Sequence, residues 1–309
     1  MASDPKDVLP DAVLRTVVAA IPEKLRQHVI VIGSLAAAYW HTGPSTSFSV
    51  RTKDVDTVLV PRGSAPQNGR DVAEELLRAK WKPKRVGEFG APGDETTPDD
   101  ELPALRLYPP ESEDWFLELL TEPDGEAQDR RDFMRFVLSN GDHYGLPSFQ
   151  FTSVATFDAV QAPVGIRVAK PEMMALANLL EHPMIKPDVI KGTTIKRSNK
   201  DLGRSLALAW LAEGELDSWH TAWLRALQTL FPSKWRDLAK RSGNGMRAML
   251  ESETDLDQAL STCNNGLLAS KQVTREQLRA TAKRLLEIVI ADIEAAAADD
   301  NRFGGVKSA

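Results

Sequence analysis

The chain has 309 residues, of which 42% are hydrophobic and 27% charged, and its formal net charge is -6 at pH 7. This composition is typical of a folded protein with one large or two ordinary domains, and it excludes wholesale disorder. The negative charge argues against a protein that coats nucleic acid non-specifically, because such binding depends on neutralising phosphates. The single cysteine, Cys263, excludes an internal disulfide and a cysteine-based zinc site.

No apolar segment follows a basic start at the N-terminus, and no apolar run approaches membrane-spanning length. We therefore expect a cytoplasmic protein with no membrane partner. The first predicted helix covers residues 11–21, where apolar side chains recur at helical spacing, and Pro22 ends it.

Residues 29–60 carry the most informative pattern. An apolar run, 29–32, is broken by Gly33 and Ser34 and followed by an alanine-rich segment, which predicts strand, tight turn and helix. The next strand opens with Asp54 and Asp56, and these lie on one face because side chains alternate along a strand. Adjacent carboxylates repel unless a cation lies between them, so the pair indicates a hard divalent ion, most often Mg²⁺.

The following segments complete an α/β pattern. An amphipathic segment at 72–81 predicts a crossover helix, and Pro83 restricts a strand at 82–89 to a short or edge position. The acidic, Gly- and Pro-rich segment 90–101 indicates an exposed, mobile loop. Two strand-like runs, 105–108 and 115–120, predict a hairpin.

From residue 124 to 151 the pattern is mixed, and we expect irregular structure with room for a further pair of strands around the Asn140-Gly141 turn. Helical patterns take over between Pro163 and Lys170. We therefore place a domain boundary there, which gives domains at 1–163 and 164–309.

The second half predicts a helical bundle with no repeat period. Its first helix begins at Pro171, and Pro183 and Pro187 end it. In the next helix a buried stripe at Leu202, Leu206 and Ala209 places four charged residues largely on other faces: Arg197, Lys200, Asp201 and Arg204. Further helices are expected at 219–231, 235–241, 246–251 and 274–298. The basic segment 186–204 suits binding of phosphates, or it is a solvated helix with internal ion pairs.

The order of apolar strand, Gly33-Ser34, helix and Asp54-x-Asp56 resembles the signature of the nucleotidyltransferase superfamily. The run Arg51–Asp56 and the pattern Arg197-x-x-Lys200-Asp201 are similar to its AbiEii-like branch, which contains toxins of abortive-infection and type IV toxin-antitoxin systems. This resemblance implies an α+β fold, with a mixed β-sheet domain flanked by helices and a C-terminal helical bundle that completes the nucleotide site. It also implies a third acid on a strand beside Asp54 and Asp56. Glu118 is the candidate, with Asp114 and Glu122 as alternatives.

The implied activity is Mg²⁺-dependent transfer of a nucleoside monophosphate from an NTP to an acceptor hydroxyl, on a tRNA 3' end or a protein. A cognate antitoxin is a further implied partner. The implied metal ligands are Asp54, Asp56 and Glu118, and the implied catalytic set adds Lys200 and Asp201. The implied substrate-binding residues are Gly33, Ser34, Arg51, Lys53 and Arg197. Two alternatives stay open: an inactive nucleotide-sensing or partner-binding module of the same fold, and a nucleotidyltransferase acting on a small molecule such as an antibiotic.

Overall fold

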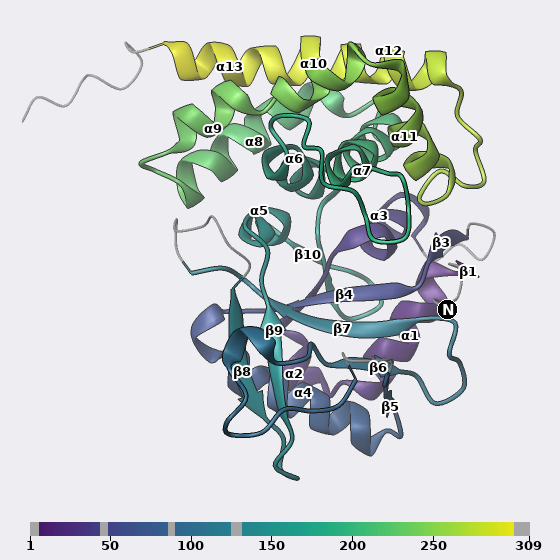
Figure 1. Ribbon diagram of the computed structural model, residues 1–309, viewed down its shortest axis with the longest axis vertical. Helices are drawn as coiled ribbons and strands as arrows, with labels where there is room; N and C mark the ends of the chain where they lie inside the picture. The colour runs from purple at the N-terminus through teal and green to yellow at the C-terminus, as the bar shows by residue number, and fades with distance from the viewer. Residues whose placement is uncertain (1–5, 44–48, 86–89, 125–131, 300–309) are drawn as a thin grey trace, which may run out of the picture. The chain divides into compact units, whose positions relative to one another are not determined.

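The computed structural model of the chain describes residues 6–43, 49–85, 90–124 and 132–299. The chain divides into two compact units, Met1–Lys170 and Pro171–Ala309, coloured purple to teal and teal to yellow in Figure 1. The division follows Lys170 rather than residue 163, because the last strand before it, β11 (Arg167–Val168), pairs with β2 (Val29–Val31) and so belongs to the first unit.

A seven-stranded mixed sheet in the order β10-β11-β2-β4-β7-β6-β5 forms the centre of the first unit. Besides β2 and β11, its strands are β4 (Asp54–Leu59), β5 (Lys82–Pro83), β6 (Arg106–Tyr108), β7 (Phe116–Thr121) and β10 (Val160–Gln161). β4 and β7 are parallel, β2 runs antiparallel to β4, and β6 and β7 form the predicted antiparallel hairpin. Strand β5 is short and lies at the edge, as Pro83 requires, and residues 86–89 of that prediction lie outside the described residues.

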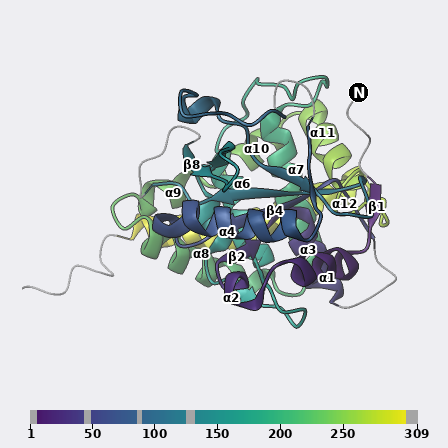
Figure 2. The same cartoon turned by 90° about the horizontal axis from the view of Figure 1, so that it is seen from below.

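Helices cover the sheet. They are α1 (Pro10–Ala20), α2 (Glu23–Arg26), α3 (Gly33–Thr42), α4 (Ala65–Arg78) and α5 (Thr152–Thr156), with short 3₁₀ turns at Arg62–Ser64 and Asp99–Glu101. Helix α4 lies across one face of the sheet (Figure 2), and a Cβ on its Gly69 would lie 3.1 Å from Leu59 Cδ1. Leu59 is fully buried and points toward α4. Because side chains alternate along a strand, Asp54 and Asp56 lie on the opposite face of β4, turned away from α4.

Two smaller strand pairs complete the first unit. β1 (Lys6–Val8) pairs with β3 (Val50–Thr52), and β8 (Phe133–Val137) pairs with β9 (His143–Pro147). The second pair supplies the further strands expected around Asn140-Gly141. Segment 90–101, predicted as a mobile loop, is attached to this hairpin: Gly93 exchanges backbone hydrogen bonds with His143, and Arg135 Nε donates to Asp99 Oδ1 at 2.7 Å.

The second unit is helical, as predicted. Its helices are α6 (Pro171–Glu181), α7 (Arg197–Leu211), α8 (Leu216–Leu230), α9 (Trp235–Arg241), α10 (Asn244–Leu250), α11 (Glu253–Asn264), α12 (Arg275–Leu285) and α13 (Ala291–Ala298). The π-helical residues Leu286–Ile290 join α12 to α13, so the predicted helix 274–298 is continuous but locally widened. Helix α11 was missing from the prediction.

The core of the second unit is built from aromatic and aliphatic side chains. Trp219 and Trp223 are fully buried, and their ring centroids lie 5.8 Å apart. Cys263 is also buried, which raises the pKa of its thiol to about 12 and fits a packing role. Among the described ranges, none of the helices has the length and apolar character that crossing a membrane demands.

Candidate functional site

The two aspartates of β4 share one face of the sheet. Asp54 and Asp56 are both half-buried, whereas Val55 and Thr57 between and after them are buried on the other face. Thr52 Oγ1 donates a hydrogen bond to Asp54 Oδ1 at 2.9 Å, which orients that carboxylate. Strand alternation alone therefore predicts from the sequence that these two side chains point to the same face of the sheet.

Gly33 lies directly against Asp56. Helix α3 begins at Gly33, whose φ of +76° lies in the region that favours glycine, and a Cβ there would lie 2.9 Å from Asp56 Oδ2. The backbone is held in this position because Ile32 N–H donates to Asp56 O at 2.9 Å. The half-buried Ser34 follows in the first turn of α3. Helix α3 thus presents its N-terminus beside the aspartate pair, and such a terminus favours anions.

Glu118 of β7 is the register partner of Asp56, so the two lie side by side on neighbouring parallel strands. Its carboxylate is committed to another residue, however. Arg106 of β6 donates from Nε to Oε2 at 3.1 Å and from Nη2 to Oε1 at 3.2 Å. Among the described residues no three His, Cys, Asp or Glu side chains are grouped to hold a metal ion, so the predicted set of three carboxylates is not assembled in this arrangement.

The two alternatives to Glu118 lie at the ends of β7 and have partners of their own. Asp114 Oδ1 lies 2.6 Å from Lys6 Nζ, and Glu122 Oε1 accepts a hydrogen bond from Thr156 Oγ1 at 2.7 Å. Of the three candidate acids, Glu118 is therefore the one that the strand register places beside Asp56.

Two cations that the sequence reasoning missed join this face. Arg106 is the register partner of Glu118, and Lys84 N–H donates to Arg106 O at 2.8 Å, which continues the β5–β6 pairing by one residue. Side chains paired in this way share a face. Three strands and the residue that follows β5 therefore carry a lateral charged row: Asp56, Glu118, Arg106 and Lys84. The available signal was that Arg106 and Glu118 each interrupt an apolar run within the predicted hairpin.

The Lys84 ammonium lies over an aromatic ring and close to other cations. Its Nζ is 3.6 Å from the centroid of the Phe116 ring, in cation–π contact. Burial, followed by the charges of Arg106 and Lys53, lowers the pKa of Lys84 to about 8, although Asp54 and Glu118 act in the opposite direction. This end of the row therefore holds positive charge at an electrostatic cost.

The other predicted substrate-binding residues of the first unit are divided by the structure. Arg51 lies in the small sheet of β1 and β3, where its Nε is 3.2 Å from Asp7 Oδ1. Lys53 lies in the bend between β3 and β4, half-buried, and acts electrostatically on Lys84. Of the two, Lys53 belongs to the charged face, whereas Arg51 belongs to a surface ion pair.

In the second unit Asp201 was predicted to lie largely away from the buried stripe of its helix, and the structure shows that it is buried as well. Asp201 is buried, because the end of α6 and the following residue pack against α7 and bring His182 Nε2 within 2.6 Å of Asp201 Oδ2. Arg204 Nη1 lies 3.5 Å from the other carboxylate oxygen. Arg197 is exposed at the first residue of α7, and Lys200 is half-buried. The Arg197-x-x-Lys200-Asp201 pattern therefore combines an exposed and a half-buried cation with a buried acid that contacts the buried His182 and the exposed Arg204.

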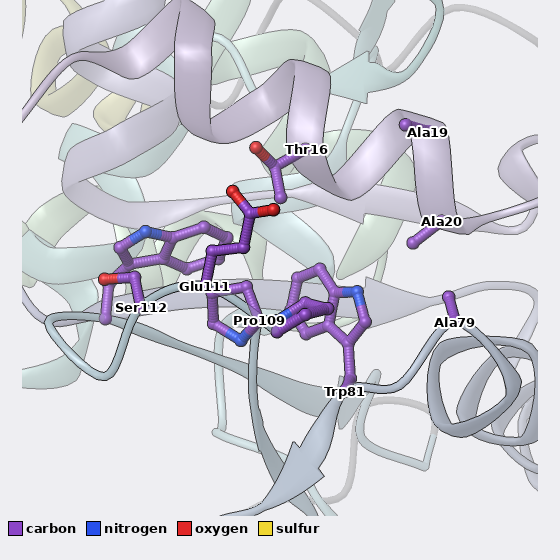
Figure 3. A pocket seen from close by; sticks show the side chains of 10 residues that line it. Thr16, Ala19, Ala20, Ala79, Trp81, Pro109, Glu111 and Ser112 are labelled. Atoms are coloured by element: carbon purple, nitrogen blue, oxygen red, sulfur yellow. The ribbon is translucent and has the colours of Figure 1, made fainter.

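A hollow of about 590 Å³ lies elsewhere on the first unit, between α1 and the β6–β7 connection (Figure 3). Thr16, Ala19 and Ala20 form its α1 wall, and Trp81 and Pro109 lie opposite. None of the aspartates of β4 lines this hollow, so it is separate from the charged face.

Comparison with known proteins gives no family assignment: neither a protein-family model nor a curated protein matches the chain.

Proposed function

We propose that the chain is a nucleotidyltransferase that moves a nucleoside monophosphate from an NTP to an acceptor hydroxyl. One observation carries the proposal: the N-terminus of α3 lies against Asp56, at a residue whose φ of +76° favours glycine, and Asp54 shares the same face. An anion-binding helix terminus beside two carboxylates is an arrangement suited to a triphosphate that carries a divalent ion.

The residues present fit Mg²⁺ in the form that nucleotides deliver it. Mg²⁺ is usually held by one or two carboxylates together with substrate phosphates and water, and not by a full cage of protein ligands. Asp54 and Asp56 are two such carboxylates on one face of β4, and Thr52 fixes the first. The bound ion would stabilise the negative charge that builds up on the transferred phosphoryl group. Glu118 is left out of this set because Arg106 holds both of its oxygens.

The remaining roles belong to the residues of the chain. Gly33 lets the backbone at the start of α3 approach the phosphates without a Cβ, and the Ser34 hydroxyl can donate to them. Lys53 contributes positive charge next to Asp54. For Lys200, Asp201 and Arg197 the roles in catalysis and nucleotide binding are those implied by the resemblance, and the buried contact of Asp201 with His182 supports a positioning role for that acid.

The nature of the acceptor is part of the proposal. A tRNA 3' end or a protein hydroxyl, and a toxin role with a cognate antitoxin, follow from the AbiEii-like resemblance. A second candidate function is a module that binds nucleotide without transferring it. The observation that favours this second candidate is the Glu118–Arg106 pair, since it withdraws the third acid from the aspartates.

The test is incubation of the protein with each α-labelled NTP, Mg²⁺ and total RNA or total protein. Label is expected to appear in one acceptor class with the parent protein and to be absent with Asp56→Ala. If no NTP labels either RNA or protein, while a known nucleotidyltransferase labels its acceptor in parallel, the proposed transfer activity is wrong. Titration calorimetry with MgNTP then separates the candidates, because a nucleotide-binding module still binds and a protein with neither function does not.

A further inference from the structure

The charged row on the sheet extends well beyond the aspartates. Asp56, Glu118 and Arg106 occupy three adjacent strands in register, and Lys84 follows directly after the fourth strand, β5, where it hydrogen-bonds to Arg106. Three inter-strand steps of about 4.8 Å separate Asp56 from Lys84, or roughly 14 Å. Gly33 lies on the opposite side of β4, since β2 and β7 flank that strand. The cationic end of the row is therefore remote from the helix terminus proposed for the triphosphate.

Arg106 is oriented but not saturated. A guanidinium has five N–H donors in a rigid fork, and the bond to each oxygen of Glu118 uses one. The side chain of Glu118 is only 9% exposed, whereas that of Arg106 is 36% exposed. The buried Glu118 carboxylate thus fixes the orientation of the Arg106 guanidinium. The N–H donors of Arg106 that do not bind Glu118 can bind a second anion at the surface.

Lys84 supplies the second cation of this end. Of the carboxylates that the structure describes, none forms an ion pair with the Lys84 ammonium. The ammonium instead lies over the ring of Phe116. Lys84 faces Arg106 and Lys53 as cations and Asp54 and Glu118 as anions, and burial together with the cations lowers its pKa to about 8. A phosphate bound here would relieve the repulsion between the cations and restore the pKa of Lys84.

We propose that Lys84 and Arg106, with Lys53 beside them, form a phosphate subsite that holds the sugar–phosphate backbone of a single-stranded nucleic-acid acceptor. Its place in a reaction rests on the proposed nucleotidyl transfer. A nucleic acid fits because phosphodiesters lie next to its terminal 3' hydroxyl along the strand. An unmodified protein side chain, in contrast, offers a hydroxyl with no phosphate nearby. Glu118 becomes a positioning residue that acts through Arg106.

The decisive variant is Lys84→Met, which removes the charge and keeps an apolar chain over Phe116. Lys24→Met, at an exposed lysine of α2, is the matched control. Binding of a short fluorescent oligoribonucleotide is measured by anisotropy with Mg²⁺ over a series of KCl concentrations. We expect Lys84→Met to weaken binding about 5- to 10-fold and to reduce the slope of log K against log salt by about 0.7, the value for one lost contact to a single strand.

The affinity for MgATP, measured by calorimetry, distinguishes the two sources of phosphate. We expect it to be unchanged in Lys84→Met, because the subsite serves the acceptor. A parallel loss of MgATP affinity would assign the cations to the donor nucleotide and overturn the inference. An oligonucleotide affinity and salt slope equal to those of the Lys24→Met control would overturn it as well.

Arg106→Lys provides a second variant, which keeps the charge but loses the fork. Weaker oligonucleotide binding with unchanged MgATP affinity is expected here too. If the parent protein binds no oligonucleotide, the inference is wrong. The proposed function is judged separately, by whether MgNTP binds and is transferred by the parent and not by Asp56→Ala.

Discussion

Arg106 binds both carboxylate oxygens of Glu118, through Nε at 3.1 Å and Nη2 at 3.2 Å. The two residues face each other on β6 and β7, each within an otherwise apolar run. A carboxylate buried in such a place is costly without a partner, and the fork of Arg106 provides two charge-assisted hydrogen bonds. Glu118 therefore influences the charged face through Arg106.

Removing one partner of this pair should destabilise the fold more than removing both. Arg106→Leu leaves the Glu118 carboxylate buried and unpaired, and we expect it to lower the free energy of unfolding by about 2 kcal/mol, less than for a fully buried pair because Arg106 is partly exposed. The double variant Arg106→Leu, Glu118→Leu should lose less. Urea unfolding of the parent, both single variants and the double variant gives the coupling free energy between Arg106 and Glu118. A purely additive cycle would contradict the pairing.

The aspartates of β4 should matter for activity and not for folding. Asp54→Ala and Asp56→Ala each remove one of two neighbouring like charges on a half-buried face, so we expect melting temperatures at or near that of the parent. Transfer of label from an NTP should fall by several orders of magnitude, because the proposed metal ligands are lost. Thermal unfolding and the labelling assay are run on the same preparations. An Asp56→Ala protein that melts well below the parent yet retains transfer would refute the site.

Gly33→Ala should weaken nucleotide binding. The new Cβ would lie 2.9 Å from Asp56 Oδ2 at a φ of +76°, so the aspartate or the start of α3 must shift. The control is Gly141→Ala, which has a φ of +87° but no atom within 4 Å of the added Cβ. Both variants carry the backbone strain, on the order of 1 kcal/mol, and only Gly33→Ala should lose MgNTP affinity. Equal affinities in the two variants would show that the contact with Asp56 is irrelevant to binding.

The lowered pKa of Lys84 predicts a pH dependence of stability. Its folded-state pKa is about 8, below the ordinary value of 10.5, so between these values the unfolded chain binds more protons. This group alone therefore makes the protein more stable as the pH rises through that window, and its cost is fully present below pH 8. The stability of Lys84→Met relative to the parent should be greatest near pH 7 and should decline toward pH 10.5, as measured by urea unfolding. A pH-independent difference, like that expected for Lys24→Met, would contradict the shifted pKa.

Asp201 should behave as a structural partner of His182 in the second unit. Asp201→Asn weakens the contact at 2.6 Å within a buried environment, and we expect a cost of about 1 to 2 kcal/mol. Lys191→Met, at an exposed position of the second unit, is the control and should leave the melting temperature nearly unchanged. Thermal unfolding compares them. If Asp201→Asn melts with the parent but abolishes transfer, the acid acts in catalysis and not in positioning.

Much of the fold could be predicted because its signals are local. The run at 29–32 followed by Gly33 predicted β2 and α3, and the helices after Pro171 were recognisable from spacing and proline. Helix α11 was missed, although Ser252 caps it with a side-chain hydrogen bond to Asp255 N–H. The pairing of β11 with β2, which moved the boundary to Lys170, joins residues far apart in the sequence and leaves no periodic trace.

In the candidate site, too, local features could be predicted from the sequence and contacts between distant residues could not. By itself the sequence determined that Asp54 and Asp56 share a face and that a glycine begins α3, because alternation and backbone preference are properties of adjacent residues. Only the tertiary structure decided that Glu118 pairs with Arg106, that Lys84 extends the charged row, and that Asp201 is buried against His182. Those relationships depend on which strands and helices become neighbours and in what register. A shift of one residue in register would have turned Glu118 to the other face of the sheet.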